Sequence, residues 1–161
     1  MKKLVLMLML FAPTAMFAQK FGHVDTQAIM QSLPEISTIN GELEAKAKQY
    51  ENELQDMQKE LQRKSQDLDS KRSTMNATKI QEAETELQTL YQKISETYQA
   101  NQQELQKLQQ EKMQPVIEKV RKAIETVGKE GGYTYIFENT VPIYTGPTSK
   151  DVTDDVKAKL K

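Results

Sequence analysis

The sequence predicts an α+β protein that is mostly α, in which a long antiparallel helical coiled-coil hairpin is joined to a small β-rich body. From about residue 40 to residue 130 the chain consists almost entirely of Gln, Glu, Lys, Leu and Ala, a composition that favours long helices. Residues 131–156, GGYTYIFENTVPIYTGPTSKDVTDDV, are instead rich in aromatic and β-branched residues, Gly and Pro, which favour strands and turns. The apolar fraction of 37% is too small for a thick single-chain core.

Residues 1–18 are predicted to be a secretory signal peptide. Lys2 and Lys3 precede an apolar run from Leu4 to Ala12, and Pro13 and several small residues follow it. This order is typical of an export signal, so cleavage is expected after Ala18. The alternative is an uncleaved membrane anchor, which the shortness of the apolar run disfavours.

The first part of the body is assigned to residues 19–35. Lys20–Asp25 contains Phe21 and Val24 around a glycine, which favours a short strand. A short helical turn is expected to follow, up to Pro34, which is tolerated at the first position of a helix.

The helical hairpin is assigned to residues 36–114. Apolar residues recur at spacings of three and four from Leu33 onward and again from Ile80, which is a coiled-coil signal. Asn76 and Thr78 are preferred helix N-cap residues, so the tip of the hairpin is expected near 73–78. Matching apolar seams on both sides of a short turn predict two antiparallel helices.

The remainder of the body is assigned to residues 115–161, and Pro115 is expected to act as a hinge at its start. A proline inside a helix removes one backbone hydrogen bond. Helical spacing of apolar residues resumes at once over Val116–Val127, which favours a kink over the alternative, a helix break. Gly131 and Gly132 are expected to end this helix.

A strand hairpin and a terminal helix are expected to follow. The strands are predicted at Tyr133–Phe137 and Val141–Tyr144, with a loop at 138–140, and Pro142 confines the second strand to an edge or to a position that donates no hydrogen bond. Thr153 is expected to be the N-cap of the terminal helix.

The sequence contains no pattern typical of an enzyme. Its single histidine, His23, lies in a predicted strand without a nucleophile motif, and no phosphate-binding, dinucleotide-binding or zinc-protease motif occurs. We therefore predict no catalytic residue, no cofactor and no metal site. The absence of cysteine excludes disulfides and thiolate ligands. A net charge of −1 argues against nucleic acid as a partner.

The order of these segments resembles the OmpH/Skp family of periplasmic outer-membrane-protein chaperones. The matching pieces are GHVD near the mature N-terminus, the segment AIETVGKEGGYTYIF, the VPIY that follows and the DVT before the final helix. The resemblance implies a periplasmic homotrimer whose β segments form a joint body. Three helical hairpins would surround a cavity that holds unfolded outer-membrane proteins without ATP. Members of the family are strongly basic, whereas this chain is nearly neutral.

There is also a physical reason to expect trimerisation, because the few short strands of one chain offer too little apolar surface to form a core of their own. The residues expected in the core of the trimer body are Val24, Tyr133, Ile136, Phe137, Ile143 and Tyr144.

The residues proposed to contact clients are Tyr91, Tyr98 and Leu105, which recur every seven residues, together with Met75. The tip of the hairpin is expected to be basic, through Arg63, Lys64, Lys71, Arg72 and Lys79. Such a cluster would attract acidic clients or an anionic membrane surface, although a merely solvated hairpin end is an equal alternative. The function predicted is an ATP-independent holdase, and the alternative is a structural or adaptor coiled coil of the cell envelope.

Overall fold

The computed structural model describes residues 19–161, so the predicted signal peptide and its cleavage site after Ala18 lie outside the described residues. The chain forms two compact units. One unit is Met30–Arg121, and the other combines Lys122–Lys161 with the described residues up to Ile29. The mostly helical architecture with a small sheet agrees with the predicted fold class.

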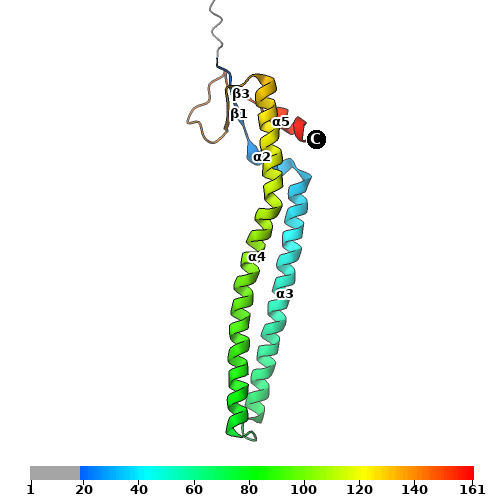
Figure 1. The fold of residues 1–161 in the computed structure, drawn as a ribbon, viewed down its shortest axis with the longest axis vertical. Helices are drawn as coiled ribbons and strands as arrows, with labels where there is room; N and C mark the ends of the chain where they lie inside the picture. The colour runs from blue at the N-terminus through cyan, green and yellow to red at the C-terminus, as the bar shows by residue number, and fades with distance from the viewer. Residues whose placement is uncertain (1–18) are drawn as a thin grey trace, which may run out of the picture. The chain divides into compact units, whose positions relative to one another are not determined.

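The unit Met30–Arg121 is an antiparallel helical hairpin (Figure 1). It contains α3 (Pro34–Lys71) and most of α4 (Ala77–Gly131), which lie side by side. The turn between them is closed by a hydrogen bond from Thr74 N to Lys71 O of 2.9 Å. Asn76 Oδ1 accepts a hydrogen bond from Lys79 N at 2.9 Å, so Asn76 caps the start of α4, as its residue type predicts.

Cross-helix ion pairs show the antiparallel register of the hairpin. The pairs are Glu35–Lys119, Glu42–Lys112, Lys46–Glu104, Lys64–Glu86 and Arg72–Glu84. The closer the α3 residue of a pair lies to the turn, the closer its partner on α4 lies to the turn as well. Between these flanking pairs the seam is mostly apolar and includes the buried side chains of Ile39 and Leu68. Solvent-exposed pairs of this kind contribute about 0–1 kcal/mol each, so apolar packing supplies most of the stability.

Helix α4 continues through Pro115 without interruption, which rules out the helix break considered as an alternative. The proline nitrogen cannot donate to the carbonyl of Glu111, so one helical hydrogen bond is lost at this point. Lys112 and Lys119 flank the proline, and each lies 2.6 Å from a carboxylate of α3. Two ion pairs therefore hold α4 to α3 on either side of the missing bond.

The other unit contains a parallel three-stranded sheet in the order β2-β1-β3. The strands are β1 (Phe21–Val24), β2 (Tyr135–Glu138) and β3 (Lys150–Asp151). In the register of the sheet Phe21 faces Tyr135 and His23 faces Phe137 on one side, and Gly22 faces Lys150 on the other. The short helix α2 (Thr26–Ser32) follows β1, and Asp25 Oδ1 accepts from Ala28 N at 2.7 Å to cap it.

The predicted strand hairpin is wrong. Val141–Tyr144 is irregular, and β2 pairs in parallel with β1 instead of with its sequence neighbour. Pro142 has no N–H to donate, which weakens this segment as a strand. Strand β1, far away in the sequence, offers β2 a complete row of backbone partners, and β3 then pairs with the other edge of β1.

Helix α4 ends at the predicted glycines. Gly132 has a φ of 64°, the left-handed conformation that glycine adopts without strain, and Tyr133 N donates to Gly128 O at 3.0 Å. Lys20 Nζ donates to the carbonyl of Gly131 at 2.8 Å and lies 4.2 Å from the centre of the Tyr133 ring. The N-terminal strand is thereby anchored to the end of α4.

The terminal helix α5 (Thr153–Leu160) begins with a cap that differs from the prediction. Asp151 Oδ1 accepts from Thr153 N at 2.9 Å and from Thr153 Oγ1 at 2.6 Å, so Asp151, and not Thr153, supplies the capping oxygen. These two hydrogen bonds hold the pKa of Asp151 below its usual value of 3.8. The Thr153 hydroxyl in turn accepts from Asp25 N at 3.0 Å, which ties α5 to the end of β1.

Candidate binding surfaces

One face of the sheet carries an exposed row of aromatic rings. Alternation along β1 and β2 places Phe21, Tyr135 and Phe137 on the same face. The rings of Phe21 and Tyr135 stack with centroids 6.2 Å apart, and those of Tyr135 and Phe137 with centroids 5.8 Å apart. Tyr135 nevertheless stays 58% exposed, and both phenylalanines are also exposed. A single chain thus leaves this apolar sheet face partly exposed.

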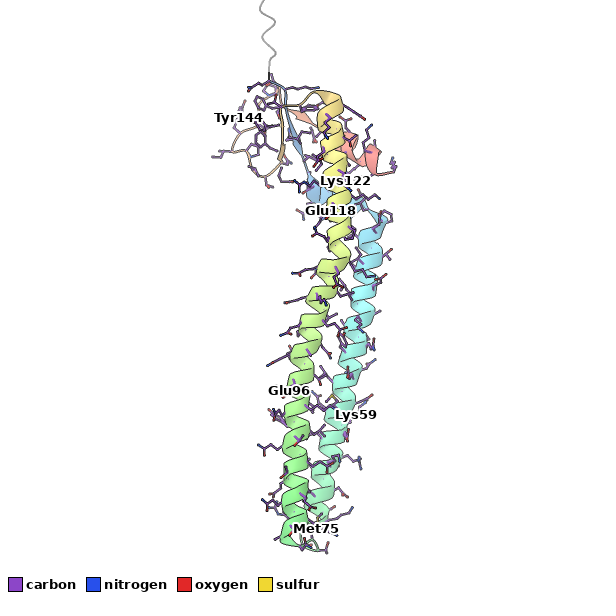
Figure 2. All side chains as sticks on the ribbon, in the orientation of Figure 1. Lys59, Met75, Glu96, Glu118, Lys122 and Tyr144 are labelled. Atoms are coloured by element: carbon purple, nitrogen blue, oxygen red, sulfur yellow. The ribbon has the colours of Figure 1, made fainter. Side chains whose placement is uncertain are left out.

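The irregular segment 139–149 adds further exposed apolar side chains to this unit. Val141, Ile143 and Tyr144 are all exposed, and Figure 2 marks the place of Tyr144 in this segment. A hollow of about 310 Å³ lies between this segment and the sheet. His23 Nδ1 lies 3.1 Å from Ser149 Oγ, which fixes the far end of the segment against β1.

The residues predicted for the core of a trimer body therefore divide into two groups. Val24 is buried within the chain, and Tyr133 and Ile136 are half-buried. Phe137, Ile143 and Tyr144 are exposed in the single chain. Three residues that were not predicted to be core, Ile29, Val152 and Val156, are almost fully buried. The four-residue spacing of the two valines around the start of α5 is the signal that would have found them.

The predicted client-contact residues of the hairpin also divide. Tyr91 is 70% exposed and Tyr98 is 54% exposed, so both rings lie outside the seam. Leu105 is half-buried and belongs to the seam, not to the exposed stripe in which it was predicted. Met75 is half-buried at the turn, where Figure 2 shows it at the end of the hairpin.

Three of the five side chains of the predicted basic tip form ion pairs with carboxylates, whereas Arg63 and Lys79 form none with any of residues 19–161. Lys64 lies 2.6 Å from Glu86, Lys71 2.6 Å from Asp67, and Arg72 2.9 Å from Glu84. Residues 63–86 contain five basic and five acidic side chains, so the formal charge of this end is zero. Contact of the tip with an anionic membrane surface remains a prediction. The net positive charge available for it is smaller than the basic residues of the tip alone suggested.

A polar layer interrupts the seam about halfway along the hairpin. Tyr50 on α3 and Asn101 on α4 are both buried, and Tyr50 Oη and Asn101 Nδ2 have no hydrogen-bond partner among residues 19–161. Burial raises the pKa of the Tyr50 phenol, and the nearby Glu104 carboxylate raises that pKa further. Lys46 lies 4.8 Å from the centre of the Tyr50 ring and 4.0 Å from Glu104.

Within the described part of the chain, no three His, Cys, Asp or Glu side chains are grouped so as to hold a metal ion. None of the helices over residues 19–161 combines the length and the apolar character needed to cross a membrane.

Comparison with known proteins identifies a family and similar solved structures. The family model described as OmpH, outer membrane protein (OmpH-like), matches residues 20–160. A crystal structure of a proposed OmpH-like outer membrane chaperone from Caulobacter crescentus CB15 is similar, with a TM-score of 0.77. It shares 18% sequence identity, and the match covers 88% of this chain and 83% of that chain. A comparison with curated proteins found no significant match.

Proposed function

The chain belongs to the OmpH-like outer membrane protein family, and we propose that it is an ATP-independent periplasmic holdase chaperone for unfolded outer-membrane proteins. The observation that carries this proposal is the exposure of large aromatic side chains outside any core. Tyr91, Tyr98 and also Ile117 are exposed on a hairpin whose remaining surface is mostly polar. Exposed apolar groups of this size are what a protein needs to hold an unfolded chain in solution.

We propose that the exposed sheet face joins three copies of the chain. The face formed by Phe21, Tyr135 and Phe137, with Val141 near it, is an exposed apolar surface of the kind that often marks a contact between proteins. Association of copies through this face would bury it, and the resemblance to the family suggests three copies. Each copy then contributes one hairpin to the assembly.

The mechanism we propose is the sum of many weak contacts. One exposed tyrosine contributes little free energy, but several hairpins in one assembly present several such sites to the same client. Binding of this kind needs no nucleotide. The client is released when folding or membrane insertion buries more of its apolar surface than the complex does. The proposed place of action is the periplasm, which the chain reaches through the predicted signal peptide.

A dilution assay tests the proposed function. A urea-unfolded outer-membrane β-barrel protein is diluted into buffer with and without the mature chain, and turbidity is followed without ATP. We expect the chain, in molar excess, to suppress the rise in turbidity. Unchanged turbidity under these conditions would reject the holdase function and favour an adaptor coiled coil with fixed partners.

A further inference from the structure

One face of α4 is free of charge over five helical turns. We define the uncharged stripe as Tyr91, Ser95, Tyr98, Gln102, Gln106 and Gln109, which follow one another at helical spacings of three and four. All six side chains are exposed. None of them makes a side-chain hydrogen bond, an ion pair or a ring contact with any of residues 19–161.

The charges of this part of α4 are kept on the opposite side of the helix. Between Tyr91 and Gln109 the charged residues are Lys93, Glu96, Glu104 and Lys107. At about 100° per residue each of them lies about 140° or more around the helix from Tyr91. Lys, Arg, Asp and Glu make up 28% of the chain, and yet the exposed stripe has none. The stripe therefore offers only amides, hydroxyls and aromatic rings.

We infer that the uncharged stripe binds extended, uncharged segments of unfolded clients through their backbone amides, and this inference rests on the proposed holdase function. A glutamine side chain both donates and accepts hydrogen bonds, as does every peptide group of an unfolded chain. The rings of Tyr91 and Tyr98 offer apolar surface, each with a polar hydroxyl at its tip, to the side chains of the bound client segment. A charged surface would instead select clients by the sign of their charge.

The length of the stripe fits this class of partner. Tyr91 and Gln109 are eighteen positions apart, which corresponds to about 27 Å along the helix axis. An extended chain of about eight residues covers the same distance. A transmembrane β-strand has about 9–11 residues with alternating apolar and polar side chains, so one stripe accommodates most of one such strand.

The test replaces amides by carboxylates in the stripe and in a matched control. The stripe variant carries Gln102→Glu, Gln106→Glu and Gln109→Glu. The control carries Gln58→Glu, Gln62→Glu and Gln66→Glu, which are exposed on α3 at similar spacing and make no side-chain hydrogen bond with any of residues 19–161. Both variants add the same charge to the hairpin without changing side-chain size. Circular dichroism and light scattering confirm that helix content and assembly mass are retained.

The readout is the affinity for a labelled, urea-unfolded β-barrel protein, measured by fluorescence anisotropy. We expect the stripe variant to bind roughly five- to thirtyfold more weakly, because each carboxylate loses a donor and must be desolvated against an uncharged chain. The control is expected to bind like the unchanged protein. The affinity of the unchanged protein is expected to vary by less than about twofold between about 50 and about 500 mM salt.

The possible outcomes separate this inference from the proposed function. If the unchanged protein suppresses aggregation but both variants bind equally well or equally weakly, the stripe is not the binding surface. A steep loss of affinity with salt would likewise overturn the inference, because binding would then be electrostatic. A change in assembly mass in the stripe variant would assign the stripe to contact between copies of the chain. Failure of the unchanged protein to suppress aggregation would reject the holdase function itself.

Discussion

The ring of Phe21 stacks on the ring of Tyr135 across two neighbouring parallel strands, with the ring planes only 5° apart. The pair joins residues that are more than a hundred positions apart in the sequence, and it lies on the exposed face of the sheet. Ile136, between Tyr135 and Phe137, takes the opposite face, where its Cδ1 approaches Gly128 of α4. Neighbouring positions of one strand therefore serve two different cores, one within the chain and one proposed between chains.

Charge substitutions at these neighbouring positions are predicted to have different effects. Phe137→Asp should dissociate the assembly, because an unpaired carboxylate in a buried apolar interface costs about 2 kcal/mol or more. The single chain should remain folded, since Phe137 is exposed within it. Ile136→Asp should instead lower the stability of the chain itself. Light scattering reports the mass and circular dichroism the folding; a Phe137→Asp protein of unchanged mass would show that this face is not the interface.

Tyr50→Phe is predicted to stabilise the hairpin. The Tyr50 hydroxyl is buried and has no hydrogen-bond partner among residues 19–161, so its removal leaves the packing of the ring intact and relieves a desolvation cost. The free energy of unfolding should rise by about 1 kcal/mol, measured by urea denaturation. Tyr91→Phe is the matched control, because the hydroxyl of this exposed residue is solvated and its loss should be neutral. A loss of stability in the Tyr50 variant would mean that a bound water satisfies the hydroxyl.

Pro115→Ala is predicted to raise stability. Alanine restores the hydrogen bond to the carbonyl of Glu111 and improves helix propensity, together worth about 3 kcal/mol at most. Part of this gain is lost if the packing between the flanking pairs Glu42–Lys112 and Glu35–Lys119 depends on the proline. Thermal unfolding measures the change, and Gln110→Ala, at an exposed site of the same helix, controls for a general effect of alanine. Lower stability in the Pro115 variant would show that packing around the proline contributes more than the restored hydrogen bond.

Asp151→Ala is predicted to loosen α5 in a pH-dependent way. Loss of the capping oxygen should cost about 1 kcal/mol at neutral pH. Because the folded-state pKa of Asp151 is lowered, its contribution is present above the ordinary value of 3.8 and is lost as the pH falls through the folded-state value. Denaturation curves of the two proteins should therefore differ at neutral pH and converge in acid. A difference that persists well below the folded-state pKa would assign the effect to packing and not to the carboxylate.

The sequence predicted the hairpin well because each of its signals is local. The seam repeats every three or four residues, and Asn76 and Gly132 mark the start and the end of α4 by their own conformational preferences. Pro115 was also correctly expected to lie within a helix that resumes after it. Composition and spacing over a few residues were sufficient for these features.

The sheet could not be predicted in the same way, because its partners are remote from one another. Nothing near Tyr135 in the sequence indicates that it pairs with Phe21. The adjacent segment Val141–Tyr144 has the composition of a strand and was therefore chosen as its partner. The cross-helix ion pairs were not predicted for a similar reason. Lys64 and Arg72 were read as part of an unpaired basic cluster, because their partners Glu86 and Glu84 are on the other helix.

The position of β1 at the centre of the sheet determines the order in which the two units can fold. The hairpin closes through contacts around a turn of a few residues, whereas both neighbours of β1 lie near the other end of the chain. Contacts of such long sequence separation carry a large loop-closure entropy and form slowly. When the chain emerges N-terminus first, β1 appears at the start and stays unpaired until Tyr135–Glu138 and Lys150–Asp151 have followed. The sheet can therefore be completed only after nearly the whole chain has been synthesised. A chain truncated before β2 would retain the hairpin but could not form the aromatic face.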